Sequence, residues 1–187
     1  MNPMDTPLFA GRLVRLVAPN LDTDPDLIAR WSRDTVFHRL ADNDAAYPLS
    51  VMDAKEWLEG DNRRSFRLAI RTLSEDRLIG TIGLWVESWS NGEAWAGIGI
   101  GERDYWGNGY GTDAMQLMLR FAFTELGLFR VSLGVYAHNL RAIRSYEKAG
   151  FRLEGRVRQD CRRDGQYFDS LFMGILREEW FAMNHDQ

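Results

Sequence analysis

The chain has 187 residues, of which 45% are hydrophobic and 27% charged, and its formal net charge at pH 7 is −4. This length predicts one domain over residues 1–187, with its core over about 9–182. The composition excludes a disordered chain and a disulfide scaffold, and the slight acidic balance argues against a nucleic-acid partner. No apolar run is long enough for a membrane span, and the first residues lack the features of a secretory signal. The single cysteine, Cys161, favours a reducing, cytoplasmic setting.

Hydrophobic periodicity and turn residues predict a defined order of elements. Strands are expected over 12–17, 66–72, 78–86, 93–101, 129–136, 151–157 and 167–176. Helices are expected over 22–33, 51–59, 113–126, 139–149 and, as a short closing helix, 177–183, with a loop between residues 33 and 51. Antiparallel hairpins therefore flank one strand–helix–strand crossover. This order predicts an α+β fold with a mixed, mostly antiparallel, twisted sheet of about seven strands and four to five helices.

Three glycines, Gly107, Gly109 and Gly111, lie between a predicted strand and a long predicted helix. Glycines let the backbone turn sharply, and the helix start offers unpaired N–H groups and a positive dipole end. Together they favour an anion site for a phosphate or pyrophosphate; a plain glycine-rich turn is the alternative. No Lys follows as in a P-loop, and the third glycine comes one residue early for a dinucleotide fingerprint.

Two segments carry a resemblance to a known family. Tyr105-Trp106-Gly107-Asn108-Gly109-Tyr110-Gly111-Thr112-Asp113-Ala114 resembles the acyl-coenzyme A loop of the GNAT acetyltransferase superfamily. The segment from Asn139 to Phe151, with Tyr146 and Gly150, resembles the second signature of that family. Within the family, the chain most resembles the RimJ/RimL branch of ribosomal-protein N-terminal acetyltransferases. The family often has Arg or Gln where Trp106 stands, so a backbone contact is expected at that position.

The resemblance implies an N-acetyltransferase in which a primary amine attacks the thioester of acetyl-CoA directly. No metal is expected, because the three histidines, His38, His138 and His185, have no ligand-like spacing. The resemblance also implies that the coenzyme is bound by two strand residues, the glycine loop and the second signature: Ile98, Ile100, Trp106, Gly107, Asn108, Gly109, Tyr110, Gly111, Thr112, Asn139 and Tyr146. The matching tyrosine in the family, here Tyr146, reaches the coenzyme sulfur. A phenol of pKa about 10 transfers its proton to a thiolate of about 8.5 only uphill, so we expect Tyr146 to donate a hydrogen bond. A tyrosine packed between helix and sheet is the alternative.

The strand over 93–101 carries glycines at alternate positions, Gly97, Gly99 and Gly101, so one of its faces has no side chains. Such a face allows a ligand, or a neighbouring element, to approach closely. Following the resemblance, we expect a backbone N–H of this strand to stabilise the oxyanion.

The sequence does not single out one residue as the general base that would accept the proton of the amine. The candidates are Glu102 and Glu93, followed by Asp104 and His138, and for each of them a solvated surface charge is the alternative. At pH 7 an α-amine is about 14% neutral, whereas a lysine-like amine is only about 0.04% neutral. An N-terminal acceptor therefore needs little help, and an aliphatic amine needs a base or a water chain.

Four tryptophans, Trp31, Trp85, Trp89 and Trp95, are candidates for the walls of an acceptor pocket, with core packing as the alternative. Five arginines over 152–163 are most simply a solvated strand face. The expected acceptor is a small-molecule amine or a peptide N-terminus, and the expected state is a monomer or homodimer. Two other functions stay open: a non-catalytic acyl-CoA-binding regulatory module, and a transferase that uses another acyl-CoA such as succinyl-CoA.

Overall fold

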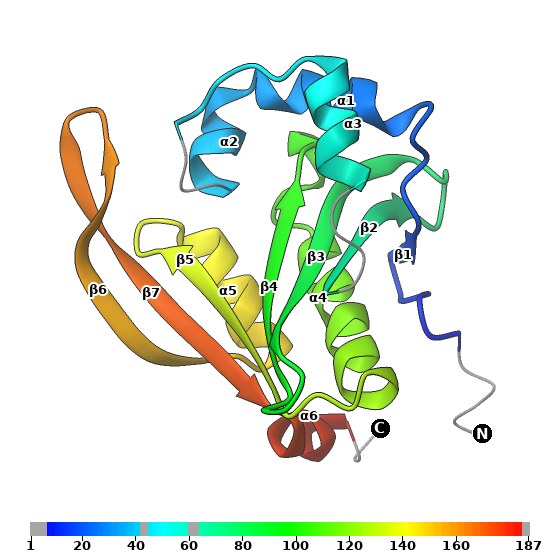
Figure 1. The fold of residues 1–187 in the computed structure, drawn as a ribbon, viewed down its shortest axis with the longest axis vertical. Helices are drawn as coiled ribbons and strands as arrows, with labels where there is room; N and C mark the ends of the chain where they lie inside the picture. The colour runs from blue at the N-terminus through cyan, green and yellow to red at the C-terminus, as the bar shows by residue number, and fades with distance from the viewer. Residues whose placement is uncertain (1–6, 42–44, 60–63, 185–187) are drawn as a thin grey trace.

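The computed structural model describes residues 7–41, 45–59 and 64–184. Its strands form one sheet in the order β1-β2-β3-β4-β5-β7-β6 (Figure 1). They are β1 (Val14–Val17), β2 (Ser65–Thr72), β3 (Leu78–Ser88), β4 (Glu93–Ile100), β5 (Arg130–Tyr136), β6 (Arg152–Arg163) and β7 (Gln166–Leu176). The β4–β5 pair is parallel, and the other neighbouring strands are antiparallel. The predicted mixed α+β sheet of about seven strands is confirmed.

The helices are α1 (Asp24–Ser32), α2 (Thr35–Ala41), α3 (Val51–Glu59), α4 (Tyr110–Arg120), α5 (Leu140–Ala149) and α6 (Arg177–Asn184). A 3-10 turn, η2 (Arg103–Tyr105), precedes α4, and a π turn, η3 (Phe121–Glu125), continues it. The segment expected as a loop after residue 33 thus contains a helix, α2. The Asp34 carboxylate caps it by accepting the N–H groups of Val36 and Phe37 at 3.0 and 3.1 Å.

Two clusters of buried side chains lie on opposite faces of the sheet. The larger combines the sheet with α4, α5 and α6, and includes Met115, Met118 and Ile175. The smaller packs α1 and α3 against the ends of β2 and β3, around Ile28, Trp31 and Leu58. Neighbouring residues of β2 point to opposite faces: Ile70 belongs to the larger cluster and Ala69 to the smaller one. The sheet is therefore covered on both faces, by different helices.

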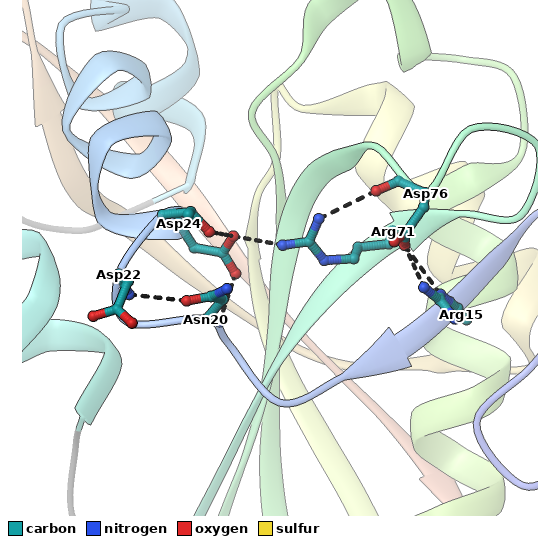
Figure 2. Close-up of polar contacts among 7 residues, drawn as sticks. Arg15, Asn20, Asp22, Asp24, Arg71 and Asp76 are labelled. Atoms are coloured by element: carbon teal, nitrogen blue, oxygen red, sulfur yellow. Dashed lines mark hydrogen bonds and ion pairs between the residues drawn. The ribbon is translucent and has the colours of Figure 1, made fainter.

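A polar cluster attaches α1 to the sheet (Figure 2). Arg71 of β2 makes an ion pair of 2.6 Å with Asp24, whose side chain is 3% exposed, and also donates to the Asp76 carbonyl at 3.1 Å. Arg15 of β1 closes the cluster through an ion pair of 2.5 Å with the Asp76 carboxylate. Because a buried carboxylate is costly unless paired, Asp24 holds the start of α1 in place on this face.

The two central strands diverge. The parallel pairing of β4 and β5 joins Glu93–Trp95 to Arg130–Ser132, and in the described part of the chain it goes no further. From there β4 continues alongside β3 to Ile100, whereas β5 continues alongside β7 to Tyr136. The unpaired edges of the two strands therefore face a gap in the middle of the sheet. In Figure 1 the β6–β7 hairpin extends beyond the body of the sheet, and α2 lies between this hairpin and the α1–α3 pair.

Candidate active site

A cavity of about 750 Å³ opens where β4 and β5 diverge. Its walls come from β3, β4 and β5, from η2 and the glycine loop with the start of α4, from α5, from α2, and from β6 and β7. Predicted site residues that line it are Trp85, Trp95, Ile98, Ile100, Trp106, Gly107, Gly109, Gly111, Thr112, Asn139 and Tyr146. The divergence of two strands in the middle of the sheet thus brings both sequence signatures to one cavity.

The glycine loop turns through left-handed backbone conformations. Gly107 and Gly109 have φ of 77° and 90°, which L side chains rarely adopt. Gly109 precedes the first residue of α4, and its carbonyl accepts the Asp113 N–H at 2.9 Å, so the helix begins at Tyr110 and not at the expected 113. No described side chain caps this helix start. Its first N–H groups, and the positive end of its dipole, are therefore available to an anion at the cavity wall.

Two side-chain contacts hold the loop against the strands and helix around it. The Trp106 Nε1–H donates to the Ile100 carbonyl at 2.6 Å, which joins the loop to the end of β4. The hydroxyls of Thr112 and Ser145 lie 2.8 Å apart and join the start of α4 to the middle of α5. The loop is therefore held against β4 and α5 at the cavity wall.

The start of α4 is also attached to β1. The Asp113 carboxylate accepts the backbone N–H groups of Arg12, Leu13 and Val14 at 2.8 to 3.1 Å. A Cβ on Gly11 would lie 2.5 Å from this carboxylate, so the close approach requires glycine there. These three N–H groups point to Asp113, and β1 begins at Val14, two residues later than expected.

Three cations on α5 line the cavity: Arg141, Arg144 and Lys148. The Arg141 guanidinium lies over the Trp106 ring, with 3.7 Å between its Cζ atom and the ring centroid, and burial lowers the Arg141 pKa. None of the three is among the site residues expected from the sequence. Their spacing, i, i+3 and i+7, places them on one helix face and was a usable signal. The arrangement puts positive charge beside the start of α4, as a polyphosphate ligand requires.

Tyr146 lies on the same helix and is 8% exposed. Its ring packs against Phe151, and its hydroxyl donates no hydrogen bond to any described residue. Burial raises the pKa of Tyr146 to about 12, so it is a neutral phenol at any ordinary pH. Asn139 is the N-cap residue of α5, and its side-chain oxygen accepts a hydrogen bond from the Ala142 N–H at 3.2 Å.

Aromatic rings cover the glycine face of β4. A Cβ on Gly97 would lie 3.0 Å from the Trp85 ring, and one on Gly99 would lie 3.0 Å from the Phe37 ring of α2. A Cβ on Gly101 would overlap the Trp31 ring. The alternating glycines thus serve close packing by rings, and two of these rings, those of Trp85 and Phe37, line the cavity.

Several predicted residues lie away from the cavity wall. Trp31 is buried under β4, and Trp89 is 47% exposed in the β3–β4 turn. Asn108, Tyr110, Glu93 and Glu102 are likewise not among the described lining residues, and Glu93 lies at the start of β4, where the strands still pair. These roles stay predictions.

The Glu102 carboxylate forms hydrogen bonds with three side chains. It accepts from Arg30, from Trp31 Nε1 at 2.7 Å and from Arg77 at 3.1 Å, and the Glu102 side chain is 13% exposed. This joins α1 to the end of β4, just before η2. The other base candidates lie elsewhere: Asp104 is exposed on η2, and His138 lines a smaller cavity of about 360 Å³ between α2 and the β6–β7 hairpin. Burial, Arg163 and Arg39 lower the His138 pKa.

The chain is similar to known proteins in sequence and in fold. The family described as acetyltransferase (GNAT) domain matches residues 14–152. The SPbeta prophage-derived uncharacterized N-acetyltransferase YokL of Bacillus subtilis (strain 168) is 32% identical over 139 residues, which cover 74% of this chain and 77% of that protein. The probable N-acetyltransferase YjcK of the same organism is 35% identical over 130 residues, with 69% and 70% covered.

The fold is also similar to that of a solved spermidine N-acetyltransferase from Vibrio cholerae, in complex with CoA and spermine. The TM-score is 0.80 at 22% sequence identity, with 90% of this chain and 98% of the other covered. The matching family, the similar N-acetyltransferases and the cavity beside the glycine loop agree. The chain belongs to the acetyltransferase (GNAT) domain family and is an N-acetyltransferase that uses acetyl-CoA.

Proposed function

We propose that the cavity between β4 and β5 binds acetyl-CoA and transfers its acetyl group to a small primary amine. The observation that carries the proposal is the meeting of three features at one cavity: the unpaired strand edges, the uncapped start of α4, and the three cations of α5. The glycine loop and Arg141 hold the phosphates. The free edge of β4 at Ile98 and Ile100 holds the extended arm and offers an N–H to the reacting carbonyl oxygen.

Acetyl-CoA supplies the acetyl group as a thioester whose thiol is the leaving group. Tyr146 contributes a hydrogen bond from its neutral hydroxyl to the sulfur. With the phenol pKa raised to about 12, full proton transfer to a thiolate of pKa about 8.5 is uphill by about 5 kcal/mol. Donation without transfer is therefore the role that its burial supports.

The acceptor amine must lose a proton before it attacks. Glu102 is engaged by two arginines and an indole, and Glu93 lies where the strands still pair, so neither has the position of a base. We propose that a water molecule in the cavity accepts this proton. Glu102 instead positions the loop. With water as the proton acceptor, the rate should rise with pH as more of the acceptor amine becomes neutral.

The acceptor binds on the α2 side of the cavity, among the rings of Phe37, Trp85 and Trp95. Of the two acceptors expected from the sequence, a small-molecule amine and a peptide N-terminus, we assign the small amine to this ring-lined space. Cys161 is a free thiol, which fits a reducing cytoplasm. In the described residues, no helix is long and apolar enough to cross a membrane.

Calorimetric titration of acetyl-CoA tests the binding site. Gly111→Leu directs a side chain toward Ile98, Ile100 and Ser145 in the cavity without requiring a left-handed backbone, and should abolish binding. Gly155→Leu on β6, where a Cβ meets nothing within 4 Å, should leave binding unchanged. Thiol release with a panel of small amines, a succinyl-CoA arm and a peptide N-terminus then tests transfer. The proposal would be rejected if Gly111→Leu still bound acetyl-CoA as the unmodified protein does. It would also be rejected if the coenzyme bound but no acceptor gave thiol release.

A further inference from the structure

Gly134 occupies a position in β5 where the protein itself does not need a glycine. Its φ is not among the positive ones, and a Cβ placed on it would meet, in the described part of the chain, one atom within 4 Å: Phe172 Cε1 at an ordinary 3.9 Å. A glycine inside a strand weakens that strand, since it costs backbone entropy and packs no side chain. Gly97 and Gly99 differ, because rings occupy the space where their side chains would be.

The space above Gly134 belongs to the cavity. Gly134 is exposed between the buried residues Leu133 and Val135, and it lines the cavity wall. In the sheet register it lies opposite Phe172, and the Phe172 ring meets the Trp95 ring edge to face, with centroids 5.8 Å apart. The missing side chain therefore leaves an open apolar floor, bordered by two aromatic rings.

The charges that line the cavity restrict what can lie on this floor. Among the described residues that line the cavity, Asp160 carries the one carboxylate, and the cations Arg141, Arg144 and Lys148 lie on α5. In the smaller cavity next to it, Arg39 forms an ion pair of 2.5 Å with Asp164. A polyamine with three or four ammonium groups would find little compensation here, whereas a single amine on an apolar body needs none beyond the reaction site.

We propose that Gly134 sets acceptor specificity, and that the acceptor is a primary monoamine with a flat aromatic body, which lies over Gly134 against Phe172 and Trp95. Stacked and edge-to-face ring contacts give such a body a defined orientation. The amine then extends toward the gap between β4 and β5. This inference rests on the proposed function, since it names the acceptor class of the same site.

The test compares 2-phenylethylamine, butylamine and spermidine as acceptors, by thiol release at saturating acetyl-CoA. The aromatic amine should have a kcat/KM at least about tenfold above both others. In Gly134→Val, a residue that strands favour, the KM for 2-phenylethylamine should rise about tenfold or more, and Gly134→Ala should give an intermediate change. Calorimetric affinity for acetyl-CoA should stay within about twofold, and the melting temperature should not fall.

Gly155→Val is the matched control, because Gly155 is a β6 glycine with open space around it that does not line the cavity. It should leave every constant unchanged. A preference for spermidine or butylamine, an unchanged KM in Gly134→Val, or loss of acetyl-CoA affinity in that variant would overturn the proposal while the enzyme still transfers acetyl groups. Absence of coenzyme binding in the unmodified protein would instead reject the proposed function together with it.

Discussion

The Arg141 guanidinium stacks on the Trp106 indole, with 3.7 Å between its Cζ atom and the ring centroid. Trp106 stands where the resembled family often has a charged or amide side chain. Here the indole carries no charge, but it orients a cation that comes from α5. Because arginine stays protonated even where burial lowers its pKa, the stack supplies a fixed positive charge beside the glycine loop.

Arg141→Ala should weaken acetyl-CoA binding about tenfold, or about 1.4 kcal/mol, because one phosphate contact loses its charge. The turnover number at saturating coenzyme should change less than about twofold, since this charge lies away from the thioester. Calorimetry and steady-state kinetics measure both. Arg33→Ala removes the same charge from an exposed position outside the cavity and should bind normally. Equal affinity in both variants would show that Arg141 does not contact the coenzyme.

Tyr146→Phe should lower turnover about 10- to 100-fold while acetyl-CoA affinity stays nearly intact. Since the folded phenol keeps its proton up to about pH 12, Tyr146 should add no alkaline limb to the rate profile below about pH 10. The same raised pKa means that its contribution to stability is complete below about pH 10 and is lost as pH rises from there toward 12. Tyr167→Phe, on the exposed hairpin, is the control. An alkaline limb below pH 10 that disappears in Tyr146→Phe would contradict this role.

Glu102→Gln should reduce stability by about 1 to 3 kcal/mol, because Arg30, Arg77 and the Trp31 indole lose a charged acceptor. Thermal or denaturant unfolding measures the change. Asp104→Asn removes the same charge from an exposed position two residues away and should change stability by less than about 0.5 kcal/mol.

The pH profile separates positioning from catalysis at Glu102. If Glu102 positions the loop, Glu102→Gln keeps the shape of the profile and lowers its height. If the acid limb of kcat/KM disappears in this variant, Glu102 is the general base and our assignment is wrong.

Asp113→Asn should cost about 2 kcal/mol of stability, since an amide cannot accept three backbone N–H groups as a carboxylate does. Because the bonds attach β1 to the start of α4, acetyl-CoA affinity should fall as well. Asp26→Asn, exposed on α1, is the matched control for loss of one negative charge. An Asp113→Asn protein with unchanged melting temperature would show that these three bonds contribute no net stability.

Local chemistry was sufficient to predict much of this molecule. Glycines and polar capping residues act within a few positions, so the glycine loop, the cap at Asn139 and the periodic strands could be located from the sequence. The helix α2 was missed because Val36 and Phe37 are weak helix formers, although the Asp34 cap was readable. The three cations of α5 shared a helix face that the sequence already implied.

The sequence by itself therefore determined the two signatures and, except for α2, the elements and their order. Only the tertiary structure decided where β4 and β5 separate, which tryptophans line the cavity, and that Glu102 is engaged by side chains 25 to 72 positions away. It also placed the open floor at Gly134 opposite Phe172. These contacts join distant segments, and packing of the whole chain selects them, whereas local propensity reaches only a few residues.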